Sequence, residues 1–256
     1  MTAPVAVRNL AKTFYDEARG DVQAVDDVSF ECRAGEIFGL LGANGAGKTT
    51  TLRILATILK PSAGSASVMG HEVLAEPEAV RASLGFSSST TALYPRLTAR
   101  ETLDFFARIN GCPRDQARER VERLIRRFGI EEYADARVDK LSQGMKQKVA
   151  IARTVVHDPP VLIFDEPTVG LDVLNALEMQ KVMAEFRAEG KAIIFSTHIM
   201  SEAEKLCDRI AIIHRGRIHA CDTLAELRVQ TGQHYLEDIF VHVVRDDAGI
   251  CEPGRP

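Results

Sequence analysis

Residues 35–59 read GEIFGLLGANGAGKTTTLRILATIL and say more about the architecture than any other part of the chain. The apolar run Glu36–Leu41 has the length and composition of a buried strand. It leads into Gly42–Thr49, which matches the phosphate-loop pattern G-x-x-x-x-G-K-[ST] in full. Apolar residues at helical spacing follow over Thr50–Leu59, and Pro61 indicates where this helix stops. The sequence therefore predicts a nucleotide-binding loop between a strand and a helix.

The chemistry of this loop depends on its backbone. Glycines let several N–H groups turn inward around phosphates, and the helix behind the loop adds a positive partial charge. We expect Lys48 to reach the β- and γ-phosphates and the Thr49 hydroxyl to hold Mg²⁺. A chance match to the pattern arises in about one chain in a hundred of this length. The expected nucleotide contacts are Gly42, Ala43, Asn44, Gly45, Ala46, Gly47, Lys48, Thr49 and Thr50.

A second apolar strand, Val161–Asp165, ends in the acidic pair Asp165 and Glu166. Ligands of parallel sheets lie at the carboxyl ends of strands, so the pair is expected to face the phosphate loop. We predict that Asp165 binds Mg²⁺ and that Glu166 accepts a proton from the water attacking the γ-phosphorus. An acidic pair at a strand end is often only a solvated turn, and the phosphate loop favours the functional interpretation.

Composition narrows the class of protein. The chain has 256 residues, 45% hydrophobic and 27% charged, as in a soluble globular protein with a full core. A net charge of -4 lacks the basic excess that is typical of nucleic-acid-binding proteins, so no nucleic-acid partner is expected. No run approaches the ~20 apolar residues of a spanning helix, and the N-terminus lacks the apolar core of a secretory signal. A cytoplasmic location is predicted, where the five scattered cysteines would stay reduced.

The order of elements indicates an α/β fold with a largely parallel sheet, because short β-branched runs alternate with amphipathic stretches. Arg215-Gly216 reads as a tight turn that makes an antiparallel hairpin at the sheet edge. Between Glu101 and Gly129 there is no strand signal, so residues 98–140 are expected to form a helical insertion. The expected strands are Val5–Val7, Val28–Glu31, Glu36–Leu41, Ala66–Val68, Leu84–Ser87, Val161–Asp165, Ala192–Ser196, Ile210–His214 and Arg217–Cys221.

The segment Leu141–Met145, with the sequence LSQGM, precedes another amphipathic helix. Ser142 is a natural N-cap, and Gly144 allows a ligand to approach closely. Alone, this is a routine helix start.

Four motifs together resemble the ATP-binding subunits of ABC transporters: GANGAGKTT, LSQGM, VLIFDEPTVGLD and STHIMSEAEKLCDR. They occur in the family's order and approximate spacing, and the resemblance runs from about Val5 to Val241. LSQGM separates the chain from kinases and small GTPases. The resemblance implies a P-loop NTPase domain of the ABC type, with an antiparallel β edge and a helical subdomain. We expect an ATP-binding α/β core over 1–97 and 141–240, a helical signature subdomain over 98–140, and a polar tail over 241–256.

The same resemblance implies roles at matching positions. Phe14, with Tyr15 as the neighbouring candidate, would stack on adenine. Ser142 and Gly144 would bind the γ-phosphate of ATP held by an opposite subunit, in a homodimer that forms on ATP binding. Asp172 would link the two sites.

His198 would contact the γ-phosphate and hold Glu166 and the attacking water in line. Alone, a histidine at a strand end is as often a surface residue. The cofactors implied are ATP and Mg²⁺.

Within the ABC family, the chain most resembles the exporter-type subunits. AVDDVSF, GEIFGLLG and LYPRLTARETL look like subunits that pair with an ABC-2 type membrane permease, on the inner face of the cell membrane. GFSSSTTALYPRLTARE is most similar to sodium-efflux ATPases of the NatA kind. Drug or lipid/polysaccharide exporter ATPases of this branch are the alternative. Non-transport ABC ATPases of ribosomes or chromosomes, and an ATP-dependent scaffold with little turnover, fit less well.

One position departs from the family. Relatives normally carry a glutamine at the end of the strand expected at Leu84–Ser87, where it ligates Mg²⁺ and senses the membrane partner. Residues 84–100 contain no glutamine, and Ser89 is the nearest equivalent. Metal ligation and coupling at that position are therefore in question.

Overall fold

Two β-sheets and their covering helices make up the described residues, 3–18, 20–88 and 92–247, of the computed structural model. The larger sheet has the strand order β10-β9-β3-β8-β7-β6, and all its neighbours are parallel except β10 and β9. Its strands are β3 (Ile37–Leu41), β6 (Leu84–Ser88), β7 (Val161–Asp165), β8 (Ala192–Thr197), β9 (Arg209–His214) and β10 (Arg217–Asp222).

The centre of this sheet is buried on both faces. Every residue of β3, β7 and β8 is buried, which explains their continuous apolar sequences. The parallel register pairs Leu41 with Thr197 and Asp165 with Ser196. The carboxyl ends of the three strands therefore lie side by side, as the sequence predicts.

The edge hairpin β9–β10 confirms the expected turn. Arg215 and Gly216 both have positive φ, 47° and 81°. Two successive positive-φ residues are what a two-residue turn needs to match the right-handed twist of the strands.

The second sheet is antiparallel, with the order β2-β1-β4-β5. β1 and β2 pair over most of their length and are much longer than the short segments expected there. Three register shifts interrupt this pairing, and none of residues 11–16 of β1 and 20–24 of β2 is buried, so no buried apolar face marks the outer half. The strands are β1 (Val5–Asp16), β2 (Gly20–Cys32), β4 (Ala63–Val68) and β5 (His71–Glu72).

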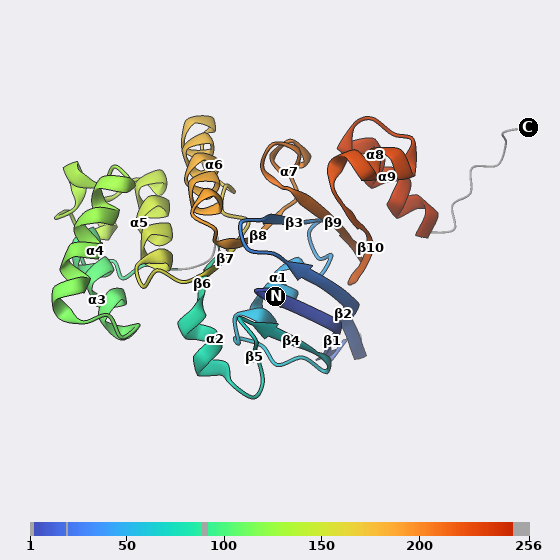
Figure 1. Cartoon of the computed structure of the whole chain (residues 1–256), viewed down its shortest axis with the longest axis horizontal. Coiled ribbons are helices and arrows are strands. Elements are labelled where there is room, and N and C mark those ends of the chain that lie inside the picture. Colours follow the sequence, from blue (N-terminus) through green and yellow to red (C-terminus); the bar gives the residue numbers. More distant parts are fainter. Residues whose placement is uncertain (1–2, 19, 89–91, 248–256) are drawn as a thin grey trace, which may run out of the picture.

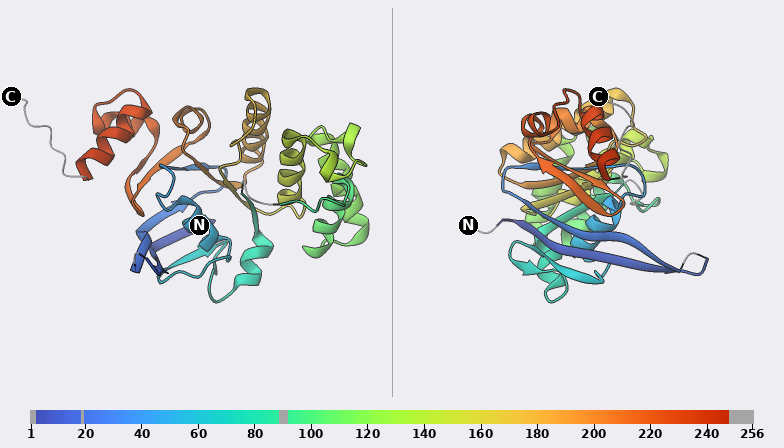
Figure 2. Two further views of the ribbon diagram at one scale, coloured as in Figure 1. Left: turned by 180° about the vertical axis from the view of Figure 1, so that it is seen from behind. Right: turned by 90° about the vertical axis from the view of Figure 1, so that its right-hand side faces the viewer.

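Helices cover both faces of the parallel sheet (Figures 1 and 2). α1 shares one buried cluster with both sheets, α6 packs in a second with β7 and β8, and α8 and α9 lie in a third with β9. The helices are α1 (Lys48–Leu55), α2 (Pro77–Ser83), α3 (Ala99–Ile109), α4 (Arg114–Arg127), α5 (Gln143–Val155), α6 (Val173–Ala188), α7 (Met200–Leu206), α8 (Leu224–Thr231) and α9 (Leu236–Asp247), with 3₁₀ turns at Glu131–Tyr133 and Val138–Lys140.

α1 is shorter than the sequence predicts. It ends at Leu55 rather than Leu59, because Thr57 takes a left-handed conformation with φ 60°. The N–H groups of Ile58 and Leu59 then both bond to the carbonyl of Arg53. The expectation of a helix reaching Leu59 was wrong for this reason.

The helical insertion of the expected fold class is confirmed. Thr98 caps α3 in a reciprocal capping box with Glu101, and α3, α4 and α5 gather at one end of the molecule (Figure 1). Their apolar faces belong to the same buried cluster as α6, so the boundaries at 98 and 140 stay a prediction.

At the C-terminal end, α9 continues through position 241, where the polar tail was expected to start. Leu236 and Ile239 are fully buried, which holds this helix against the molecule. Within the described ranges, no helix is long and apolar enough to cross a bilayer.

Candidate active site

The phosphate loop connects β3 to α1 and depends on close backbone contacts. Gly47 has φ 104°, and a Cβ atom there would lie 2.5 Å from the carbonyl oxygen of Ala24. A Cβ at Gly42 would lie 2.4 Å from the carbonyl oxygen of Ile213. Both distances are too short for a side chain, so these two glycines fix the path of the loop between β2, β9 and α1.

Lys48 is the first residue of α1, and its side chain turns back into the loop. It is only 4% exposed, and Nζ donates to the carbonyls of Gly42 at 2.7 Å and Ala43 at 3.1 Å. Nζ also lies 3.2 Å from Glu166 Oε1. An ammonium has three donors, so these three acceptors use all of them. A phosphate that binds Lys48 has to replace at least one.

Thr49 and Asp165 meet across the ends of α1 and β7. Thr49 Oγ1 donates to Asp165 Oδ1 at 3.1 Å, and Ser196 Oγ donates to the same oxygen at 2.6 Å. Asp165 is 4% exposed. A buried carboxylate is stable when hydroxyls satisfy it in this way, and its remaining lone pairs are available to a cation.

Glu166 follows Asp165 in a left-handed conformation, with φ 50°. Its N–H donates to the carbonyl and hydroxyl oxygens of Ser196, at 3.2 and 3.1 Å. This turn directs the side chain to Lys48 on one side and to His198 on the other, where Nδ1 lies 3.2 Å from Oε1. A strained conformation of a non-glycine residue is typical of functional sites.

The structure thus brings together five of the expected site residues: Lys48, Thr49, Asp165, Glu166 and His198. They come from the carboxyl ends of β7 and β8 and from the loop after β3. A cation, two carboxylates and an imidazole at one loop can bind phosphates and move a proton.

Ser142, Gly144 and Asp172 form a second group. Ser142 caps α5 by accepting from the N–H of Met145 at 3.3 Å, which confirms its expected capping role. Asp172 caps α6 and accepts from Asn175, whose side chain would lie 2.8 Å from a Cβ at Gly144. Hydrogen bonds from the N–H and side chain of Asn175 lower the pKa of Asp172. These residues are therefore neighbours, with Asn175 between them.

Phe14 lies on the outer part of the β1–β2 hairpin, which extends beyond the rest of the molecule (Figure 2). Its ring is 38% exposed, with Lys12 Nζ 5.0 Å from the centroid, and Tyr15 is 78% exposed. The choice between them as the adenine-stacking residue stays a prediction. Ser89 lies outside the described residues.

Two residues with structural roles at the site were missed in the sequence. Ser196 supports both Asp165 and the turn at Glu166, and Gln147 Nε2 donates to the carbonyl of Pro167 at 2.9 Å. Ser196 has a sequence signal, because it is a polar residue near the carboxyl end of an apolar parallel strand, two positions before His198. Gln147 has no sequence signal that distinguishes it from an ordinary residue on a helix surface.

Comparison with known proteins places this geometry in a family. The family model described as ABC transporter matches residues 25–169, more than half of the 256 residues. The chain belongs to the ABC transporter family. It is an ATP-binding subunit of that family and an ATPase, as its site residues predict.

Individual relatives agree with this assignment. The chain is 41% identical to the ABC transporter ATP-binding protein NatA of Bacillus subtilis, over 93% of this chain and 96% of that protein. It is 42% identical to the Nod factor export ATP-binding protein I of Burkholderia lata, over 84% of this chain and 69% of that protein. It is 38% identical to the doxorubicin resistance ATP-binding protein DrrA of Mycobacterium tuberculosis, over 91% and 70%.

Solved structures give the same result for the fold. An ATP-binding subunit of an ABC transporter superposes with a TM-score of 0.85 at 33% identity, covering 94% of this chain and all of the other. A dimeric ATP-binding cassette bound to ADP and phosphate superposes with a TM-score of 0.78 at 25% identity, covering 86% and 98%. The expected fold class is confirmed.

Proposed function

We propose that this chain hydrolyses ATP to drive an exporter, acting on a separate ABC-2 type membrane permease at the cytoplasmic face of the membrane. The observation that carries the proposal is the position of Glu166 Oε1, 3.2 Å from both Lys48 Nζ and His198 Nδ1. The hydroxyl–carboxylate pair Thr49–Asp165 lies beside it. Relatives named for export support the direction of transport.

Mg²⁺ fits the residues present. Thr49 Oγ1 and Asp165 Oδ1 are 3.1 Å apart. Two adjacent oxygens of an octahedron with bonds of 2.0–2.1 Å lie about 3 Å apart, so the pair can hold one ion between them. The ion, when bound, neutralises charge on the β- and γ-phosphates.

The reaction uses the chain's own groups in three roles. Lys48 exchanges its contact with Glu166 for the phosphates, which frees the carboxylate. Glu166 accepts a proton from the water that attacks the γ-phosphorus, as the bond from that phosphorus to the bridging oxygen breaks to give ADP and phosphate. His198 holds Glu166 through Nδ1. Positioning of this kind supplies much of the rate in phosphoryl transfer.

Two copies are proposed to close on two ATP molecules. α5, which Ser142 caps, is separated from α1 by β7 and α6 (Figure 1). This separation supports the proposal that Ser142 and Gly144 complete a site on a second copy rather than their own. Asp172, beside them, is exposed and available to the same partner.

Light scattering of Glu166→Gln tests the dimer, because this change keeps the shape but removes the base. We expect a dimer in saturating ATP-Mg²⁺ and a monomer without nucleotide, since nucleotide binding and dimerisation are linked. Ser142→Arg, at the same protein concentration, should stay monomeric. A monomeric Glu166→Gln in ATP-Mg²⁺ counts against the two-copy site.

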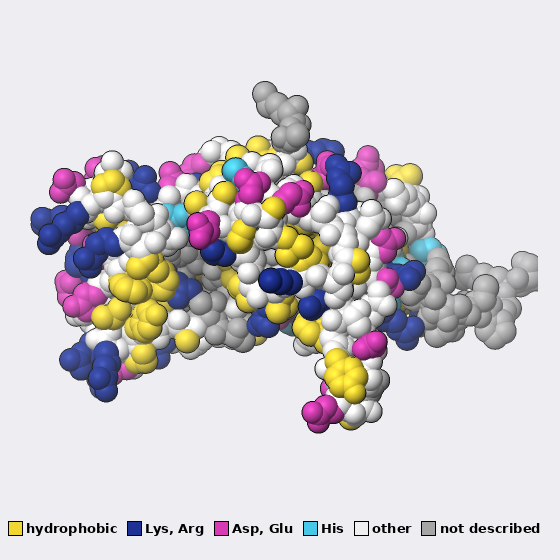
Figure 3. All heavy atoms as spheres, turned by 90° about the horizontal axis from the view of Figure 1, so that it is seen from below, with side chains coloured by type: hydrophobic (Ala, Val, Ile, Leu, Met, Phe, Trp, Pro, Cys, Tyr) yellow, Lys and Arg dark blue, Asp and Glu magenta, His cyan; other side chains and the backbone are white. Residues whose placement is uncertain are grey.

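An exposed aromatic cluster supports docking to a membrane protein. The ring of Tyr94 packs edge-on to that of Phe105 at 5.8 Å, and both rings lie against Phe106. Tyr94 is 53% exposed and Ile109 is 58% exposed. Figure 3 shows hydrophobic side chains gathered over the end of the molecule formed by α3 and α4. Apolar surface of this kind is typical of interaction sites.

Sodium is the proposed cargo, on the strength of the resemblance to sodium-efflux ATPases. Reconstitution of the chain with its membrane partner in vesicles tests it. ATP-driven ²²Na⁺ movement that is lost with Lys48→Ala is the expected result. Transport of doxorubicin or of a lipid-linked glycan, with no sodium movement, would instead support the alternative exporters of this branch.

A further inference from the structure

A cavity of about 320 Å³ lies between the C-terminal end of α4, the middle of α5 and one side of α6. Its size falls at the lower end of the range for small-molecule sites, about 300–1,000 Å³. Gly144 and Leu171 line it, so one end reaches the elements that carry the signature segment and the loop before α6. The active-site residues Lys48, Asp165 and Glu166 do not line it.

The floor of the cavity is apolar. Phe128, Ile151 and Met179 line it, and their side chains are 6%, 1% and 6% exposed. A ring or short alkyl group resting on them would be removed from water, which stabilises binding by about 25 cal/mol per Å² of apolar area. Methionine adapts well to the shape of such a group.

The walls carry an excess of positive charge. Arg126, Arg127, Lys148 and Lys181 line the cavity against Glu178 and Glu185, which is four positive and two negative charges.

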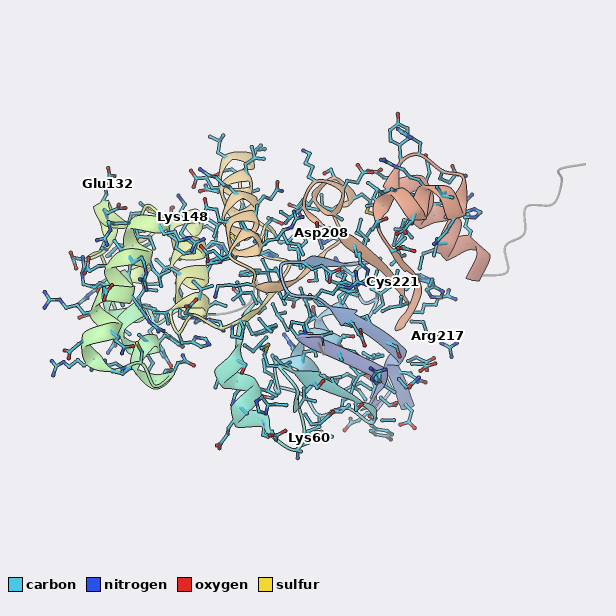
Figure 4. All side chains as sticks on the ribbon, viewed as in Figure 1. Lys60, Glu132, Lys148, Asp208, Arg217 and Cys221 are labelled. Atoms are coloured by element: carbon cyan, nitrogen blue, oxygen red, sulfur yellow. The ribbon has the colours of Figure 1, made fainter. Side chains whose placement is uncertain are left out.

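Two of the cations are already paired. Lys148 contacts Glu178 at 2.5 Å, on the side of α5 that faces α6 (Figure 4). Arg127 contacts Glu185 and Glu189 at 3.3 and 2.8 Å and stacks on the ring of Phe186.

The other two cations are unmatched. In the described part of the chain, no carboxylate lies within ion-pair distance of Arg126 or Lys181. Both are exposed and sit on different helices, α4 and α6, on either side of the cavity. A ligand with one negative group above an apolar body would match this arrangement.

We propose that the cavity binds a small amphipathic anion: an aromatic or short alkyl body with one carboxylate, sulfonate or phosphate. The body lies on Ile151 and Met179, and the anionic group lies toward Arg126 and Lys181. Such a ligand contacts α4 and α5 on one side and α6 on the other, so it ties the helical end of the molecule to the core. The site is distinct from Lys48, Asp165 and Glu166, which do not line it, although Gly144 lines one end of it.

Titration of the full chain with 8-anilinonaphthalene-1-sulfonate tests this proposal, because that probe is an amphipathic anion whose fluorescence rises in apolar sites. Excess ADP-Mg²⁺ keeps the probe out of the nucleotide site. We expect one saturable site per chain. Met179→Trp, which fills the cavity, should abolish binding. Charge reversal with Arg126→Glu and Lys181→Glu together should weaken binding at least about tenfold.

Two controls separate the parts of the proposal. Arg118→Glu changes an exposed arginine of α4 that does not line the cavity, and it should leave the affinity unchanged. The uncharged analogue 1-anilinonaphthalene should bind wild type more weakly than the sulfonate does. Its affinity should be the same in the charge-reversal variant as in wild type. Equal affinity of the sulfonate probe in wild type and in both cavity variants would overturn the site. Loss with Met179→Trp but no effect of charge reversal would overturn its anionic specificity.

Folding of each variant is checked by circular dichroism and melting temperature. If Met179→Trp fails to fold, the double charge reversal decides, because both of its positions are exposed and its matched control is Arg118→Glu.

Discussion

Lys48 Nζ lies 3.2 Å from Glu166 Oε1, so the proposed phosphate-binding cation and the proposed base are in contact. The Lys48 side chain is only 4% exposed, and the Glu166 side chain is 19% exposed. Their attraction is therefore stronger than that of a surface pair, and it holds both side chains in the site. In the proposed mechanism, phosphates compete for Lys48 and thereby release Glu166 for proton transfer.

Glu166→Gln should lower the rate of hydrolysis by about 10²–10⁴-fold, because the amide cannot accept the proton. ATP binding should persist, since Lys48 loses a competing partner. Phosphate release and binding of a fluorescent ATP analogue measure the two effects. Glu17→Gln, at an exposed turn, is the matched control. Hydrolysis at the wild-type rate in Glu166→Gln would assign the base to another group.

His198→Ala should reduce kcat with little change in KM for ATP. His198 Nδ1 contacts Glu166 Oε1 at 3.2 Å. Loss of the imidazole therefore leaves the Glu166 carboxylate in the site but no longer holds it in position. Misplacement by about 1 Å can cost on the order of a hundredfold in rate. Steady-state kinetics separate the two constants. An increase in KM with kcat unchanged would mean that His198 binds substrate without positioning Glu166.

Gly47→Ala and Gly45→Ala form a matched pair, because both glycines have positive φ, 104° and 79°. A Cβ at Gly47 meets the Ala24 carbonyl at 2.5 Å, whereas a Cβ at Gly45 meets nothing within 4 Å. Gly45→Ala should lower the free energy of unfolding by about 1–2 kcal/mol through backbone strain. Gly47→Ala should cost more and distort the loop. Chemical denaturation of both variants measures the difference, and equal losses would show that the contact with β2 is not required.

Stability at acidic pH should depend on His157. Burial lowers the pKa of its imidazole, and Nδ1 has no hydrogen-bond partner among the described residues. The unfolded chain, with a pKa near 6.5, then binds the proton more readily than the folded chain. The contribution of His157 is complete above about pH 6.5 and is lost as pH falls below it.

Urea denaturation between pH 7 and pH 5 checks this sign. The free energy of unfolding should fall less steeply in His157→Gln than in wild type. His234→Gln, at an exposed histidine, provides the control. Parallel pH profiles for wild type and His157→Gln would contradict the assignment.

The sequence predicted the parallel core well, because buried parallel strands are continuous apolar runs. Val161–Asp165 has the same limits in the sequence analysis and in the structure. The Arg215-Gly216 turn and the Ser142 cap were also predictable, since local backbone chemistry decides both.

Features that depend on tertiary partners were missed. The outer part of β1 and β2 is held by strand pairing, and none of residues 11–16 and 20–24 is buried, so no buried apolar face marks these ends in the sequence. Ser196 acquires its role only when β8 lies beside β7. The sequence analysis expected Glu166 to face the phosphate loop, but the direct contact with Lys48, 118 positions away, depends on the side-chain geometry of the fold.

The central claim is that the phosphate loop around Lys48 is the site of ATP hydrolysis. Measuring phosphate release by the purified wild-type chain and by Lys48→Ala tests this claim most directly. Wild type should release phosphate from ATP-Mg²⁺, and Lys48→Ala should release none above background, because the change removes the buried ammonium inside the phosphate loop. Lys60→Ala, at the exposed lysine labelled in Figure 4, should match wild type. Phosphate release by Lys48→Ala at the wild-type rate would contradict the assignment of the active site.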